Sequence, residues 1–201
     1  MPSKEREYRS MELRIQKRED GDEPSFFVEG YASTFEPYVM FVDEDGNEYS
    51  ERIEPTAFDG ADMTDVVFRV DHVGRVYART SAGTVEVWAD DHGLGQKTDL
   101  GRTQKARELY ADIEAGNYPK MSFAFSVAED HYDKATRTRV IDRIEKVYDV
   151  SPVSFPANPT TELSVSTRDY FNGVIEAEKA ERLEREARER KIQQLKILAK
   201  L

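Results

Sequence analysis

Residues 120–127 read KMSFAFSV, and this stretch decides the fold class of the protein. Large apolar side chains alternate with small ones, so the large ones share one face of an extended strand and the small ones, beginning with Ser122, share the other. A period of two is typical of a half-buried strand rather than of a helix. The sequence therefore predicts a strand here, with one face in the core and one face of small side chains.

The same period of two recurs along residues 1–167 and predicts a mainly β domain. Further strands are predicted over five segments that turn signals separate (residues 11–15, 26–34, 65–70, 84–89 and 138–150). One amphipathic helix is predicted over residues 103–115, because apolar residues recur there at helical spacing and Gly116 follows as a C-cap. The expected fold class is α+β, a mainly β barrel or sandwich with helices.

Residues 168–201 differ in composition from the rest and predict one long, charged C-terminal helix. They carry nine basic and seven acidic residues and no proline. Their apolar residues are sparse until the end of the chain (Ile192, Leu195, Ile197 and Leu198). We therefore expect a domain of residues 1–167 and a helical tail of residues 168–201. The tail is either a solvated helix with an apolar end or a helix that binds a partner or itself.

Composition excludes several classes of protein. The 201-residue chain has a net charge of −11 at pH 7, and residues 1–167 alone carry 33 acidic and 20 basic residues, or −13. Such a surface repels nucleic acid, so no nucleic-acid partner is expected. No segment approaches the roughly 20 apolar residues that cross a bilayer, and the N-terminus lacks the apolar segment of a secretory signal, so we expect a soluble protein that is not exported. The absence of cysteine rules out disulfides, a thiol nucleophile and thiolate metal ligands.

Each of the three histidines follows an aspartate, which raises the hypothesis of a metal site. His92 falls in a predicted turn and His131 in a predicted polar loop, where exposed polar residues are expected. His72 differs, because it ends the apolar strand of residues 65–70. It is either a packed histidine or a catalytic one.

Ser122 and Asp149 are the other candidates for chemistry. A serine becomes a nucleophile only beside a base, so Ser122 matters only if the fold brings a histidine to it. Asp149 lies among apolar neighbours, where a carboxylate needs a partner. It either pairs with a histidine or caps the turn before Ser151. Three prolines after Val150 predict that the strand ends there.

The order of these motifs resembles that of the prohead, or capsid maturation, protease family of tailed phages. The resemblance covers roughly residues 10 to 165, and it is carried by five segments in order: FFVEGYASTFEP (26–37), ERIEPTAFDG (51–60), VDHVGRVYART (70–80), IEAGNYPKMSFAFSV (113–127) and VYDVSPVSFPANPTT (147–161). The runs G-x-Y-x-x-M-S-F-x-F at 116–125 and D-V-S-P-V-S-F-P-A-N-P at 149–159 are the most specific of them.

The resemblance implies a serine endopeptidase without a cofactor, built as a β-barrel flanked by helices and similar to the herpesvirus assembly proteases. It assigns Ser122 as the nucleophile and His72 as the general base. Asp149 is expected to orient the histidine, although many relatives have Glu at this position and the herpesvirus enzymes use a second histidine. His92 and His131 therefore stay open as alternatives for this third role.

The resemblance also implies where the enzyme acts and on what. The expected substrates are the scaffold, the scaffolding segment of the capsid protein and the protease itself, and the expected location is the host cytoplasm, inside the assembling prohead. Self-association through the barrel or the C-terminal helix is a further expectation. The tail helix is expected to pack on scaffold helices and to be removed by autocleavage. Two competing functions are a metal-dependent hydrolase that uses the Asp-His pairs and a non-enzymatic assembly factor.

Overall fold

The computed structural model describes residues 6–12, 26–154 and 165–198. The chain divides into two units, Met1–Ser164 and Val165–Leu201. Part of the predicted strand at residues 11–15 and residues 155–161 of the last family motif lie outside the described residues.

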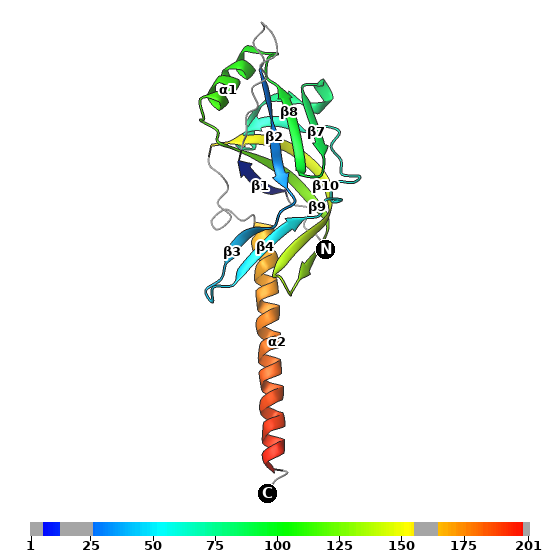
Figure 1. The fold of residues 1–201 in the computed structure, drawn as a ribbon, viewed down its shortest axis with the longest axis vertical. Helices are drawn as coiled ribbons and strands as arrows, with labels where there is room; N and C mark the ends of the chain where they lie inside the picture. The colour runs from blue at the N-terminus through cyan, green and yellow to red at the C-terminus, as the bar shows by residue number, and fades with distance from the viewer. Residues whose placement is uncertain (1–5, 13–25, 155–164, 199–201) are drawn as a thin grey trace. The chain divides into compact units, whose positions relative to one another are not determined.

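The described strands of the first unit form two sheets (Figure 1). The larger sheet has seven strands and the smaller has three in the order β2-β8-β7. In the larger sheet the order is β1-β9-β10-β4-β3, with β5 pairing β10 and β6 pairing β5. The larger sheet consists of β1 (Glu7–Glu12), β3 (Tyr38–Val42), β4 (Glu48–Ile53), β5 (Val67–Val70), β6 (Val73–Arg79), β9 (Lys120–Asp133) and β10 (Thr138–Val153), and the smaller of β2 (Phe27–Thr34), β7 (Val85–Ala89) and β8 (Gly93–Asp99).

The predicted α+β class is therefore confirmed, and the mainly β character with it. A closed barrel is not found among the described strands, because their hydrogen bonds divide them between two sheets. Barrel closure stays a prediction of the resemblance.

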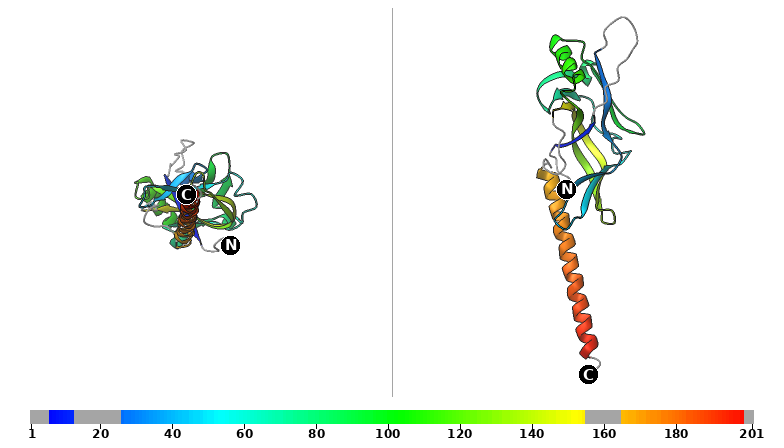
Figure 2. Two further views of the ribbon diagram at one scale, coloured as in Figure 1. Left: turned by 90° about the horizontal axis from the view of Figure 1, so that it is seen from below. Right: turned by 60° about the vertical axis from the view of Figure 1, so that its left-hand side comes forward.

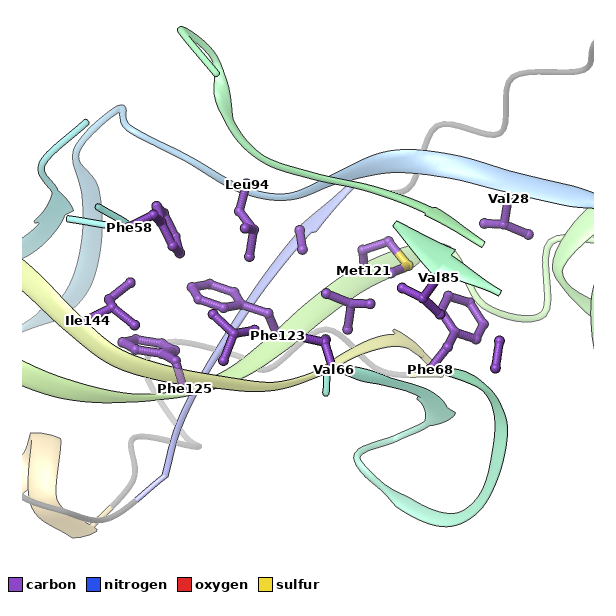
Figure 3. Packing of buried hydrophobic residues seen from close by; sticks show 14 of the residues in the cluster. Val28, Phe58, Val66, Phe68, Val85, Leu94, Met121, Phe123, Phe125 and Ile144 are labelled. Atoms are coloured by element: carbon purple, nitrogen blue, oxygen red, sulfur yellow. The ribbon is translucent and has the colours of Figure 1, made fainter. Parts of the chain in front are cut away.

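The large side chains of β9 lie in the core, as the alternation predicted. Phe123 and Phe125 are fully buried and stack with their ring centroids 4.5 Å apart. Figure 3 shows them among buried apolar side chains of other elements (Phe58, Leu94 and Ile144). Because this face fills the core, the small face of β9 is left for the functional site.

Two segments are longer strands than the sequence predicted. β9 extends to Asp133 and includes His131, which was expected in a loop, because the segment pairs with β10 as a long hairpin. β10 continues past Val150 to Val153, although it contains Pro152. The carbonyl of Pro152 accepts from the backbone N–H of Asp71, so the ring nitrogen faces the β5–β6 turn, where no ladder bond requires a donor.

The predicted helix over residues 103–115 is confirmed as α1 (Gln104–Glu114). The side chain of Thr103 caps it by accepting from the Ala106 N–H. Ala106, Leu109 and Ile113 of its apolar face are buried, Tyr110 is partly buried, and Gly116 follows with φ of +83°, as a C-cap requires. A short 3-10 helix, η1 (Thr80–Ala82), joins β6 to β7.

The second unit contains the predicted long C-terminal helix, α2 (Val165–Leu198; Figures 1 and 2). Every residue from 179 to 198 is exposed. An exposed pair four residues apart, Glu186 and Arg190, places a carboxylate oxygen 3.9 Å from a guanidinium nitrogen, which contributes about 0.3–0.5 kcal/mol. Neither this helix nor any other helix in the described part of the chain is long and apolar enough to span a bilayer.

A buried network of ion pairs holds β1 to the rest of the large sheet. The Arg9 guanidinium donates to Glu7 at 2.7 Å and to Glu51 at 2.5 and 2.6 Å, and Arg139 donates to Glu7 at 2.7 and 3.0 Å. Burial would raise the pKa of Glu7, but the charge of Arg9 and the hydrogen bonds from Arg139 outweigh it and lower this pKa from 4.5 to about 2. Glu7 is therefore held in its charged form by the folded state.

This shift predicts a specific acid sensitivity. Because the folded pKa of Glu7 is depressed, the stability that its charge contributes is present above about pH 4.5 and is lost as the pH falls toward 2. The loss is on the order of 3 kcal/mol in the free energy of unfolding. The free energy of unfolding, measured by urea denaturation between pH 2 and pH 6, should fall with decreasing pH in the wild type and fall less steeply in Glu7→Gln. Glu44→Gln, at an exposed turn position, should keep the wild-type slope, and an unchanged slope in Glu7→Gln would contradict the prediction.

Candidate active site

His72 lies in the tight turn that joins β5 to β6. Asp71 and His72 have φ of +48° and +58°, which is the backbone that a two-residue type I′ hairpin turn requires. The turn is tied to the end of β10, because the Asp71 carboxylate accepts from the backbone N–H of Ser154 at 2.8 Å and from its hydroxyl at 2.5 Å. These bonds hold the turn in an unfavourable backbone conformation and thereby fix the orientation of the His72 imidazole.

Ser122 lies near the start of β9, between β1 and β10 of the large sheet. It pairs with Ser10 of β1 on one side and with Ser151 of β10 on the other, and it is 1% exposed. Both edges of β9 are therefore occupied beside Ser122.

The three residues assigned from the resemblance lie in contact with one another. The Nε2 atom of His72 lies 2.7 Å from the Ser122 hydroxyl oxygen, and Nδ1 lies 2.6 Å from an Asp149 carboxylate oxygen. Asp149 is 1% exposed, and its side chain shares a face of the sheet with Ser122 because residues 149 and 151 oppose 124 and 122. The structure thus links a hydroxyl, an imidazole and a buried carboxylate in one chain of hydrogen bonds.

Two further residues, which the sequence did not assign to the site, contact these hydrogen-bonded groups. The Ser151 hydroxyl donates to the same Asp149 oxygen that His72 contacts, at 2.7 Å. The ring of Tyr8, on β1, packs against the imidazole of His72 with centroids 4.5 Å apart. The Asp149-x-Ser151 spacing could have indicated Ser151, because residues two apart in a strand share a face. No sequence signal indicated Tyr8, which reaches His72 only through the pairing of β1 with β9.

The other two histidines lie elsewhere. His92 packs edge-on against Tyr31, with ring centroids 4.4 Å apart. His131 pairs with Asp142 at 2.6 Å and lies nine residues along β9 from Ser122, which is about 30 Å at 3.3 Å per residue. Within the described part of the chain, no group of three or more His, Asp or Glu side chains has the arrangement of a metal site.

A serine hydroxyl, an imidazole and a carboxylate linked in this order are the groups that serine hydrolases use. The profile of the caudovirus prohead serine proteases matches residues 11–176 of this chain. The chain belongs to that family, and it is therefore a serine protease of the kind that acts in phage capsid maturation. This finding removes the competing classes of metal-dependent hydrolase and non-enzymatic assembly factor.

Among solved structures, the capsid assembly protease of bacteriophage T4 is similar, with a TM-score of 0.44 and 13% sequence identity over 75% of this chain and 98% of that one. No curated protein matches the chain significantly. The similarity to herpesvirus assembly proteases stays a prediction.

The hydrogen bond from Ser151 to Asp149 predicts a measurable effect on reactivity. Ser151→Ala removes a donor from the buried carboxylate of Asp149. We therefore expect Ser122 to react about fivefold more slowly, which corresponds to about 1 kcal/mol in activation free energy. The rate of labelling by a fluorophosphonate probe, which reacts covalently with activated serines, measures this. Ser126→Ala is the matched control, because Ser126 is a buried serine of β9 whose hydroxyl lies 3.3 Å from Glu145 instead. Equal labelling rates for wild type and Ser151→Ala would contradict the prediction.

Proposed function

We propose that Ser122 is the nucleophile of this protease, that His72 is its general base and that Asp149 orients His72. The observation that supports this assignment is the continuous chain of hydrogen bonds at 2.7 and 2.6 Å through the two ring nitrogens of His72. A nucleophile, a base and an orienting carboxylate within hydrogen-bond reach are what serine proteolysis requires.

Asp149 determines which ring nitrogen of His72 carries the proton. A carboxylate can only accept a hydrogen bond, so Nδ1 carries the proton that points at Asp149. The lone pair on Nε2 is then free to accept the proton of Ser122. Burial of Asp149 beside the ring also stabilises the imidazolium that forms during the reaction.

The reaction then proceeds in two halves. The Ser122 oxygen attacks the carbonyl carbon of the scissile peptide while its proton moves to Nε2 of His72, which gives a tetrahedral intermediate. The C–N bond breaks, the leaving amine takes the proton from His72, and an acyl-enzyme remains on Ser122. Water attacks the ester with His72 again acting as base, and the released acid leaves Ser122 with its proton restored.

The geometry supports an extended peptide lying across the face of the sheet as the substrate. Both edges of β9 are occupied at Ser122 by β1 and β10, so a peptide approaches from the face on which Ser122 and the small Ala124 lie. We propose that the peptides cleaved are the scaffold, the scaffolding segment of the capsid protein and the protease itself, inside the assembling prohead in the host cytoplasm. Membership of the prohead protease family supports this choice.

For the tail, we propose that α2 recruits the enzyme by packing on helices of the scaffold. Its surface supports a partner, because several large apolar residues are 44–66% exposed (Leu183, Ile192, Leu195, Ile197 and Leu198). Exposed apolar side chains grouped on a helix are a common feature of helix-binding surfaces. Autocleavage near the start of α2 would release the domain after maturation.

The catalytic assignment predicts the behaviour of three variants. Co-expression with the capsid protein of the same phage should yield shortened capsid subunits on a gel for the wild type. Ser122→Ala and His72→Ala should reduce processing by about 10⁴-fold or more, because each removes a group at which bonds form and break during the reaction. Asp149→Asn should cost about 10⁴-fold, because the amide favours the wrong tautomer of His72.

The matched control for these variants is His131→Ala, which alters an exposed ion pair far from Ser122 and should leave processing at the wild-type rate. Processing should also persist in EDTA. Full processing by Ser122→Ala would refute the assignment of the nucleophile, and wild-type processing by Asp149→Asn would refute the role of the carboxylate.

Recruitment by α2 gives a separate prediction. A chain that ends at Thr167 should keep the fluorophosphonate labelling rate of the full chain, since labelling requires only the site, but its copy number in proheads should fall at least about tenfold. Quantitative gels of purified proheads measure this. Equal packaging of the truncated and full chains would contradict the role proposed for the helix.

A further inference from the structure

We infer that Arg69 is a positioning residue of the active site, which balances the buried charge of Asp149 and holds the turn that carries His72. The inference rests on the catalytic assignment proposed above and adds a residue to it. Arg69 lies on β5, three residues before His72.

The strand pairing around Arg69 is irregular in a way that re-aims its side chain. The register between β5 and β6 shifts both between Phe68 and Arg69 and between Arg69 and Val70. Bulges of this kind are common beside active sites, where they turn one side chain out of the regular alternation. Here the guanidinium of Arg69 lies between the backbone of the turn and the carboxylate of Asp149.

The first contact of Arg69 is with the turn. Its Nη1 atom donates to the backbone carbonyl of His72 at 3.3 Å. His72 has φ of +58°, a conformation that a residue with a Cβ adopts only when surrounding contacts hold it. The Arg69 bond supplies one such contact from β5, and the bonds between Asp71 and Ser154 supply others from β10.

The second contact is electrostatic. One oxygen of Asp149 accepts two hydrogen bonds, one from His72 and one from Ser151. The other oxygen lies 4.0 Å from Nε of Arg69. In the catalytic assignment His72 is the general base and takes up a proton only during the reaction, so it supplies no permanent positive charge beside Asp149. Arginine is always charged, and it is the permanent cation in contact with this carboxylate among the described residues.

The burial of the Nε atom of Arg69 supports this role. Within the described part of the chain, Arg69 and Arg52 are the two arginines whose Nε is buried without a hydrogen-bond partner. Arg52 forms its ion pair with the neighbouring Glu54, at 2.5 Å. A buried donor without a partner is unfavourable. At Arg69 the attraction to a carboxylate that is 1% exposed offsets this cost, since a buried charge interacts more strongly than an exposed one.

The test compares fluorophosphonate labelling of the full-length protein in three variants, Arg69→Gln, Arg69→Lys and Arg52→Gln. We expect Arg69→Gln to lower the maximal labelling rate at least about tenfold, or about 1.4 kcal/mol in activation free energy, with less than about a twofold change in the half-saturating probe concentration. Arg69→Lys keeps the charge and should recover most of the rate. Arg52→Gln removes the matched arginine, which lies opposite Val140, nine residues before Asp149 on β10, and should label at the wild-type rate.

A double-mutant cycle separates this role from a merely structural one. In an Asp149→Asn background no carboxylate charge remains to be balanced, so adding Arg69→Gln should slow labelling much less than it does in the wild type. The same slowing in both backgrounds would overturn the inference, as would wild-type labelling by Arg69→Gln or no recovery by Arg69→Lys. If Arg69→Gln melts at a lower temperature, the lysine variant and the cycle still decide the question. Labelling that persists in Ser122→Ala would instead refute the catalytic assignment itself, so the two failures are distinguishable.

Discussion

The antiparallel pairing of β9 with β10 is the constraint on which the rest of the structure depends. It sets Ser122 opposite Ser151 and Ala124 opposite Asp149, so the carboxylate and the hydroxyl share one face of the sheet. A register shift of one residue would turn Asp149 into the core and leave Ser122 without a partner. The hydrophobic face of β9 opposes such a shift, because Phe123 and Phe125 are fully buried on the other side.

The strand β1 contributes side chains to both faces of this sheet. Glu7 and Arg9 lie opposite Phe125 and Phe123, and they join the buried ion network, whereas Tyr8 lies opposite Ala124 and packs on His72. The ion pairs that attach β1 therefore also fix the ring that covers the imidazole. Buried charges of this kind are a weak source of net stability, but they are specific in register, since a shifted strand would leave them unpaired.

Local sequence patterns predicted the elements that depend on local rules. The alternation in residues 120–127 predicted the buried face of β9, and the spacing of apolar residues followed by Gly116 predicted α1. The prediction was wrong where pairing partners decide the outcome. His131 lies in β9 rather than in a loop because β10 pairs with it, and Pro152 is tolerated in β10 because its nitrogen faces a turn instead of a neighbouring strand.

By itself, the sequence determined the fold class, the long charged helix and the identity of the candidate groups, because composition, periodicity and motif order are properties of the chain. Only the tertiary structure decided how these groups meet. His72 reaches Ser122 because the left-handed turn between β5 and β6 is hydrogen-bonded to the end of β10, through Pro152 and Ser154, far along the chain. Tyr8 and Arg69 join the site through strand pairing and a bulge. The contacts of Tyr8 with His72 and of Arg69 with Asp149 link residues many positions apart, and no local pattern of side chains specifies them.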